Sequence, residues 1–114
     1  MDATELILLY DYYGDLLTDR QRECFELRYN QDLSLGEIGQ ELGISRQGVF
    51  DNLSRAEALL RNMEEKTGCV RRDMRCRSVM QTVRMAADKL IMHTDGQIVA
   101  IGKQIMDAAS ELEE

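Results

Sequence analysis

The sequence predicts an all-α protein, built from a small helix-turn-helix module followed by a C-terminal antiparallel helical hairpin. The 114 residues include no proline, and the chain is rich in Leu, Met, Ala, Glu and Arg, a composition typical of helices. Apolar residues recur at intervals of three and four along most of the chain. Ser or Thr precedes several of these stretches and Gly follows them, which marks helix ends.

The first two helices are expected in residues 2–14 and from Thr18 onward. Leu6, Tyr10 and Tyr13 recur at helical spacing and give the first helix one apolar side. Thr18 and Gln21 form a capping-box pattern, which predicts the start of the second helix. The residues of the second helix expected to be buried are Cys24, Phe25, Leu27 and Tyr29.

The stretch "SLGEIGQELGISRQGVFDNL" predicts two short helices joined by a tight turn. Ser34 and Glu37 form a second capping box, Gly43 suits the left-handed turn, and Ser45 caps the next helix. The buried side of that helix is expected to consist of Val49, Leu53, Ala56 and Leu60. Residues 1–68 are therefore expected to form a helix-turn-helix module, winged-helix-like or sigma region-four-like.

A helix-turn-helix docks by inserting the first residues of its second helix into the major groove. Arg46 could bind guanine and Gln47 adenine, although the same residues could form an ordinary solvated helix face. The candidate contact residues are Ser45, Arg46, Gln47, Phe50, Asp51, Ser54 and Arg55. Residues 1–66 hold 14 acidic and 7 basic side chains, a charge balance that disfavours strong binding to duplex DNA.

The segment "EIGQELGISRQGVFDNLSRAEALL" resembles region four of bacterial sigma factors, which binds promoter DNA with this second helix. Those factors tend to carry basic side chains where this chain has uncharged or acidic ones. The positions concerned are Phe50, Asp51, Asn52 and Glu57.

Residues 10–57, with "LLTDRQ", "DLSLGEI" and "SRQGVFDN", are more closely similar to the YlxM family of small bacterial proteins. This resemblance implies a regulatory, non-enzymatic role in the signal recognition particle pathway. The implied partners are the protein of the particle, its RNA, or both. Sequence-specific binding of duplex DNA by a transcriptional regulator remains the alternative.

Residues 69–114 are expected to form the hairpin, with Thr94 and Gln97 capping its second helix. The two predicted apolar seams are Val79, Val83, Ala86 and Leu90, and Ile98, Ile101, Ile105 and Leu112. Further apolar residues beside these seams make each apolar arc wider than one partner helix can cover, which predicts a homodimer. The alternative is a monomer whose hairpin folds back onto the first helix.

The remaining patterns are weaker. One basic cluster could bind nucleic-acid phosphates or could simply form a solvated helix start: Arg71, Arg72, Arg75 and Arg77. There is no phosphate-binding Gly-rich loop, no catalytic-triad pattern and no metal-ligand spacing, so we expect neither an enzyme nor a cofactor. No apolar run is long enough to span a membrane, and residues 1–17 lack the features of a secretory signal, which predicts a cytoplasmic protein.

Overall fold

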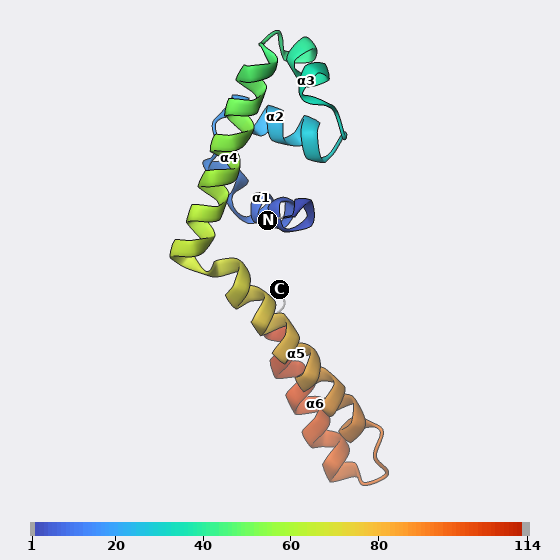
Figure 1. Ribbon diagram of the computed structural model, residues 1–114. Helices are drawn as coiled ribbons and strands as arrows, with labels where there is room; N and C mark the ends of the chain where they lie inside the picture. Colours follow the sequence, from blue (N-terminus) through green and yellow to red (C-terminus); the bar gives the residue numbers. More distant parts are fainter. Residues whose placement is uncertain (1, 113–114) are drawn as a thin grey trace. The chain divides into compact units, whose positions relative to one another are not determined.

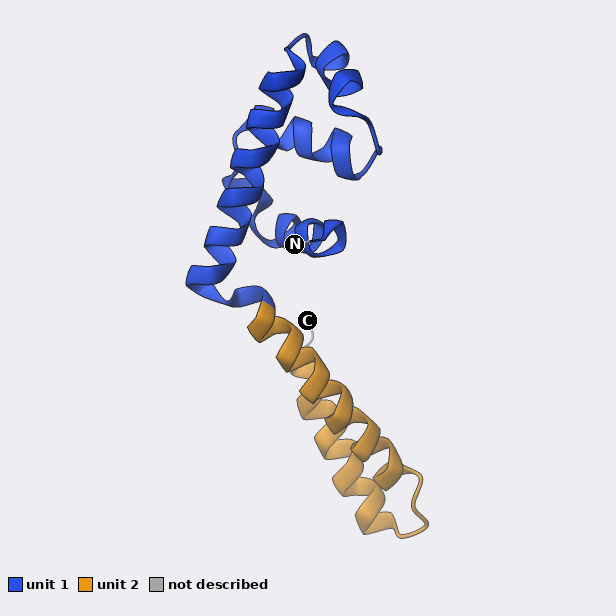
Figure 2. Cartoon of the chain, viewed as in Figure 1, with its two compact units in different colours: residues 1–70 blue, residues 71–114 orange. Residues whose placement is uncertain are grey.

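The computed structural model describes residues 2–112, which form six α-helices and one short 3-10 helix. The helices belong to two compact units, one ending at Val70 and the other beginning at Arg71 (Figure 2). This boundary lies two residues beyond the expected one. The elements are α1 (Ala3–Tyr13), η1 (Gly14–Leu16), α2 (Asp19–Tyr29), α3 (Leu35–Leu42), α4 (Arg46–Thr67), α5 (Cys69–Ile91) and α6 (Gly96–Glu111).

The all-α prediction is confirmed, because no strand occurs between residues 2 and 112. A winged helix needs a strand hairpin, so the winged-helix-like description does not fit this part of the chain. Among the described helices, none combines the length and the apolar character that crossing a membrane requires.

In the first unit, α1, α2 and α3 pack along one side of the long helix α4 (Figure 1). All four residues expected on the buried side of α4 are indeed buried. In α2, Cys24 and Phe25 are fully buried, as expected, whereas Leu27 and Tyr29 are only half-buried. The largest side chains that are completely enclosed are Phe25, Ile38, Leu60, Val49 and Cys24. All residues of this core belong to the first unit. Because α3 and α4 both contribute to it, the core holds the start of α4 against α3.

Both predicted capping boxes of this unit are present. The Thr18 hydroxyl accepts a hydrogen bond from the Gln21 backbone N–H, and the Gln21 side chain accepts one from the Thr18 N–H. Ser34 and Glu37 form the same reciprocal pair at the start of α3. These hydrogen bonds to backbone and side chain lower the pKa of Glu37 below its ordinary value. The third helix therefore starts where its capping sequence predicts.

Three tyrosines connect the helices of the first unit by donating hydrogen bonds to glutamate carboxylates that lie far away in the sequence. Tyr10 of α1 donates to Glu26 of α2 over 2.7 Å, and its ring stacks on Phe25. Tyr29 of α2 donates to Glu57 of α4. Burial, reinforced by the adjacent carboxylate, raises the pKa of both tyrosines to about 12.

The third tyrosine, Tyr13, connects α1 to the C-terminal end of α4. Its hydroxyl donates to Glu64 over 2.8 Å and lies 2.7 Å from the hydroxyl of Thr67. The same Glu64 carboxylate accepts the backbone N–H of Val70, whose side chain completes the core. Burial also raises the pKa of Tyr13.

These tyrosines predict that the first unit loses stability at alkaline pH. The folded protein favours the neutral phenol, so the stabilisation is fully present below the unfolded pKa of 10.0. It is lost as the pH rises toward about 12 for Tyr10 and Tyr29. Urea denaturation at stepped pH should show a falling free energy of unfolding over this range. The double variant Tyr10→Phe, Tyr29→Phe should show a shallower fall, and an unchanged slope would contradict this assignment.

The second unit is a hairpin of α5 and α6, joined by residues 92–95. The two backbones approach closely at Gly102, where an added Cβ would lie 2.9 Å from the Ala87 carbonyl oxygen and 2.9 Å from the Ile91 backbone nitrogen. Only small residues are fully buried within this unit's described part: Ala87, Gly102 and Ala109. The interface between α5 and α6 is therefore narrow.

One expectation for this hairpin is wrong, and the covering of its apolar seams by a second chain stays a prediction. Val79 and Ala86 of the first predicted seam, and Ile101 of the second, are exposed, so the other helix of the hairpin does not cover them. The close contact at Gly102 rotates each helix so that the rows centred on Ala87 and Gly102 face each other. The cap of α6 is Asp95, which accepts a hydrogen bond from the Gln97 N–H over 2.8 Å, and not Thr94.

Candidate functional site

The turn between α3 and α4 is held by a close backbone approach. Gly43 ends α3 with a φ of 70°, and the Ile44 N–H donates to the Gly39 carbonyl oxygen over 3.0 Å. A Cβ on Gly39 would lie 2.7 Å from the Ile44 carbonyl oxygen, so only glycine fits without a backbone shift. The position of Gly39 thus sets how closely α3 approaches the first turn of α4.

Helix α4 begins with the predicted cap, since the Ser45 hydroxyl accepts a hydrogen bond from the Gly48 N–H over 2.9 Å. The seven residues predicted as contacts all lie exposed on its first turns: Ser45, Arg46, Gln47, Phe50, Asp51, Ser54 and Arg55. We call this set the α4 face. Their exposure allows a partner to reach them, and their role in binding remains a prediction.

The polar side chains of the α4 face differ in how they are engaged. Within residues 2–112, Arg46 and Arg55 form no hydrogen bond or ion pair with another residue. In contrast, the Gln47 side-chain nitrogen donates to the Asp51 carboxylate over 3.0 Å. The two arginines are therefore ready to bind an anion, whereas Gln47 must give up a hydrogen bond before it can bind a base.

Phe50 lies beside an open hollow of about 510 Å³ on the surface of the first unit. The hollow is lined by Leu35 from the first turn of α3 and by Arg46, Gln47 and Phe50 from α4. Phe50 is 52% exposed, which is unusual for a large aromatic side chain with no polar group. The exposed ring of Phe50 next to the free guanidinium of Arg46 can bind a ligand that combines a flat ring with a nearby negative charge.

Two residues expected on this exposed surface are instead half-buried, and their side chains form hydrogen bonds within the first unit. The side chain of Asn52 is half-buried and donates to the Gly48 carbonyl oxygen over 2.8 Å. Glu57 is half-buried too, and it accepts the hydroxyl hydrogen bond of Tyr29. Asp51 is thus the one carboxylate of the α4 face, and its partner Gln47 comes from the same helix.

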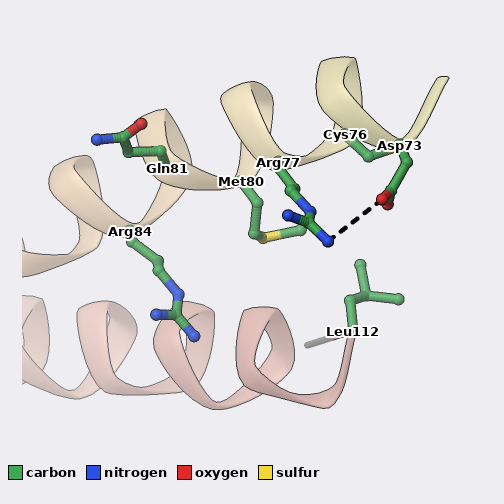
Figure 3. A pocket seen from close by; sticks show the side chains of 7 residues that line it. All are labelled: Asp73, Cys76, Arg77, Met80, Gln81, Arg84 and Leu112. Atoms are coloured by element: carbon green, nitrogen blue, oxygen red, sulfur yellow. Dashed lines mark ion pairs between the residues drawn. The ribbon is translucent and has the colours of Figure 1, made fainter. Parts of the chain in front are cut away.

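The second candidate, the basic cluster at the start of α5, does not form one uniform patch. All four of its arginines are exposed, but Arg77 is ion-paired with Asp73 at 3.3 Å. Figure 3 shows Arg77 and Arg84 pointing into a hollow of about 710 Å³ that also contains Met80 and Leu112. Helical periodicity places Arg72 and Arg75 on a different side of α5 from Arg77. Arg77 therefore points away from Arg71, Arg72 and Arg75, which share one side of the helix.

The cysteines also differ in their surroundings. Cys24 is fully buried in the core of the first unit, and burial raises the pKa of its thiol. Cys69 and Cys76 are exposed and free. None of the three lies on the α4 face.

A family profile described as "Putative helix-turn-helix protein, YlxM / p13 like", of the family UPF0122, matches residues 1–97. A UPF0122 protein of Thermoanaerobacter sp. (strain X514) is 45% identical over 113 residues, which covers 99% of this chain and 95% of that protein. A UPF0122 protein of Caldanaerobacter subterraneus subsp. tengcongensis is 58% identical over 71 residues, which covers 62% of this chain and 61% of that protein.

These matches agree with the two short helices, the left-handed turn at Gly43 and the capped start of α4 described above. The chain belongs to the UPF0122 family of YlxM/p13-like helix-turn-helix proteins.

Proposed function

We propose that the protein is a non-enzymatic, cytoplasmic regulator of the signal recognition particle pathway, which binds the RNA of the particle through the α4 face. The pathway comes from the family resemblance of residues 10–57. The observation that supports an RNA contact is the exposed ring of Phe50 beside the unpaired guanidinium of Arg46 at the edge of an open hollow.

This combination fits the chemistry by which proteins bind RNA that is not fully paired. Unpaired bases stack on aromatic side chains, and arginines bind the adjoining phosphates. Arg46 also lies in the first turn of a 22-residue helix, whose N-terminus favours a negative charge. A stacked base on Phe50 and a phosphate at Arg46 would thus occupy neighbouring positions on one surface.

The acidic charge of the chain is concentrated ahead of this surface in the sequence. Residues 1–19 hold five acidic and no basic side chains, whereas residues 20–55 hold six acidic and five basic ones. The helix-turn-helix itself is therefore nearly neutral. Because only two free arginines are offered to phosphates, ionic contacts alone would give weak binding, and stacking must supply much of the affinity.

Reading of duplex DNA is the second candidate, since the α4 face lies where a helix-turn-helix contacts the major groove. Arg46, Gln47 and Arg55 would then carry the contacts. Two observations count against it. Gln47 is already bound to Asp51, and the Asp51 carboxylate would lie close to DNA phosphates.

We therefore expect the full chain to bind duplex DNA weakly at physiological salt, and to bind the particle's RNA more tightly. Both can be measured by fluorescence anisotropy over a range of salt concentrations. With two phosphate contacts, the slope of log affinity against log salt for duplex DNA should be about −2. Nanomolar binding to a defined duplex, lost on Arg46→Ala, would favour the DNA-binding regulator instead.

Arg46→Ala should weaken RNA binding severalfold, because it removes a charged contact to phosphate. Lys103→Ala, which removes one exposed positive charge from α6, is the matched control and should leave binding nearly unchanged. Equal losses in the two variants would show that net charge, and not the α4 face, determines affinity. Binding to the particle's protein without its RNA would contradict the RNA assignment.

A further inference from the structure

The outer side of the hairpin carries a long apolar stripe that α5 and α6 do not cover. Val83 and Leu90 lie four residues before and three residues after Ala87, and Ile98 and Ile105 have the same offsets from Gly102. Because Ala87 and Gly102 face each other and the helices are antiparallel, residues at equal offsets lie on the same side of the hairpin. The two rows therefore form one surface.

This surface, which we call the hairpin stripe, continues onto exposed neighbours at heptad spacing. Its α5 row is Val79, Val83, Ala86 and Leu90, and its α6 row is Ile98, Ile101, Ile105, Ala108 and Leu112. Val79 is 56% exposed and Ile101 is 51% exposed. A repeat of 3.5 residues sustained on two adjacent helices is the pattern of helices that pack against further helices.

The hairpin also buries too little to be stable without a cover. It comprises residues 71–114, and no large side chain of its described part is fully buried. Units of about 40 residues with so small a core usually need another chain, a metal or disulfides. Cys76, the one cysteine of this unit, is free.

We infer that the hairpin stripe binds the hairpin stripe of a second copy of this chain, forming an antiparallel four-helix bundle. One copy supplies half of such a bundle, and two copies related by a two-fold axis parallel to the helices would place α5 of each against α6 of the other. Each α5 row then has an α6 row of matching heptad spacing to pack on.

The charges beside the stripe favour this pairing over α5 against α5. The outer edge of the α5 row carries Arg75, Thr82 and Lys89, which are all exposed. The corresponding edge of the α6 row carries Gln97, Gln104 and Glu111, also exposed. Pairing α5 with α6 brings Arg75 within about one helical turn of Glu111 of the second copy, whereas α5 against α5 would oppose two basic edges.

The test is the oligomeric state of the full chain, measured by sedimentation at micromolar concentration. The wild-type chain should be a dimer, and Ile101→Glu should weaken dimerisation by at least about tenfold, because it places a charge in the centre of the bundle. Met85→Glu is the matched control: Met85 is 59% exposed on α5 and, two residues before Ala87, points away from the stripe. It should leave the dimer intact.

Val79→Glu, on the other helix, should act like Ile101→Glu. Because the hairpin needs a cover, circular dichroism should show that both variants lose part of their helix content while the first unit stays folded. A monomeric wild-type chain would overturn the inference, as would a dimer that survives both stripe variants. Equal dissociation by Met85→Glu would also overturn it, and so would a stripe occupied by a different protein. The outcome does not depend on RNA binding.

Discussion

Gly39→Ala is expected to lower the free energy of unfolding by about 1–3 kcal/mol and to weaken binding at the α4 face. The new Cβ would meet the Ile44 carbonyl oxygen at 2.7 Å, and it also faces backbone atoms of Ser45 and Arg46. Because these are backbone atoms at the start of α4, no side-chain rotation relieves the clash. The first turn of α4 must shift, and Arg46 shifts with it. Urea denaturation and RNA titration measure the two effects.

Gly36→Ala is the matched control in the same short helix. The nearest atom to its added Cβ is 4.0 Å away, and the site is exposed. Alanine there should be neutral or stabilise by up to about 1 kcal/mol, because it reduces the conformational freedom of the unfolded chain. If both glycine variants had the same stability, the close approach at Gly39 would not be the constraint that sets this turn.

Phe50→Ala is expected to weaken binding to the particle's RNA by about tenfold or more, while the melting temperature stays nearly constant. Stacking of one base on an aromatic side chain contributes about 1–3 kcal/mol, and alanine offers no comparable surface. Phe50 is 52% exposed and is not among the residues of the core, so its loss leaves little cavity. Anisotropy titration and thermal denaturation separate binding from stability.

Leu16→Ala controls for the removal of an exposed apolar side chain from the same unit. Leu16 is 55% exposed in η1 and does not belong to the α4 face. Its loss should leave RNA affinity unchanged. A drop of several degrees in the melting temperature of Phe50→Ala, with binding intact, would show that Phe50 is a packing residue.

Most of the first unit could be predicted from local patterns. The capping boxes at Thr18 and Ser34, the turn at Gly43 and the buried side of α4 all depend on residues three or four positions apart, and the structure has them as expected. The exposure of the α4 face follows from the same periodicity, because residues opposite a buried side must face outward.

The tyrosine–carboxylate bonds could not be predicted, because their partners lie far apart in the sequence. Tyr13 and Glu64 are 51 residues apart, and Tyr29 and Glu57 are 28 apart. No local spacing marks such a pair. For the same reason Glu57 was expected to be exposed, although it accepts a hydrogen bond from α2.

The hairpin shows a different limit of sequence patterns. Its heptad rows correctly marked apolar surface, but periodicity does not tell which of two adjacent apolar rows faces the partner helix. The small residues Ala87 and Gly102 determine which row of each helix faces the other helix, because they allow the closest backbone approach. Gly102 therefore directs Val79 and Ile101 outward, onto the hairpin stripe.

The most direct test of the central claim is hydrogen–deuterium exchange of the full chain with and without the particle's RNA. Binding through the α4 face predicts protection concentrated in residues 45–55, with the remainder of α4 and helix α6 little changed. The Phe50→Ala variant should lose this protection at the same RNA concentration. Protection confined to residues 71–77, at the basic start of α5, would contradict the account.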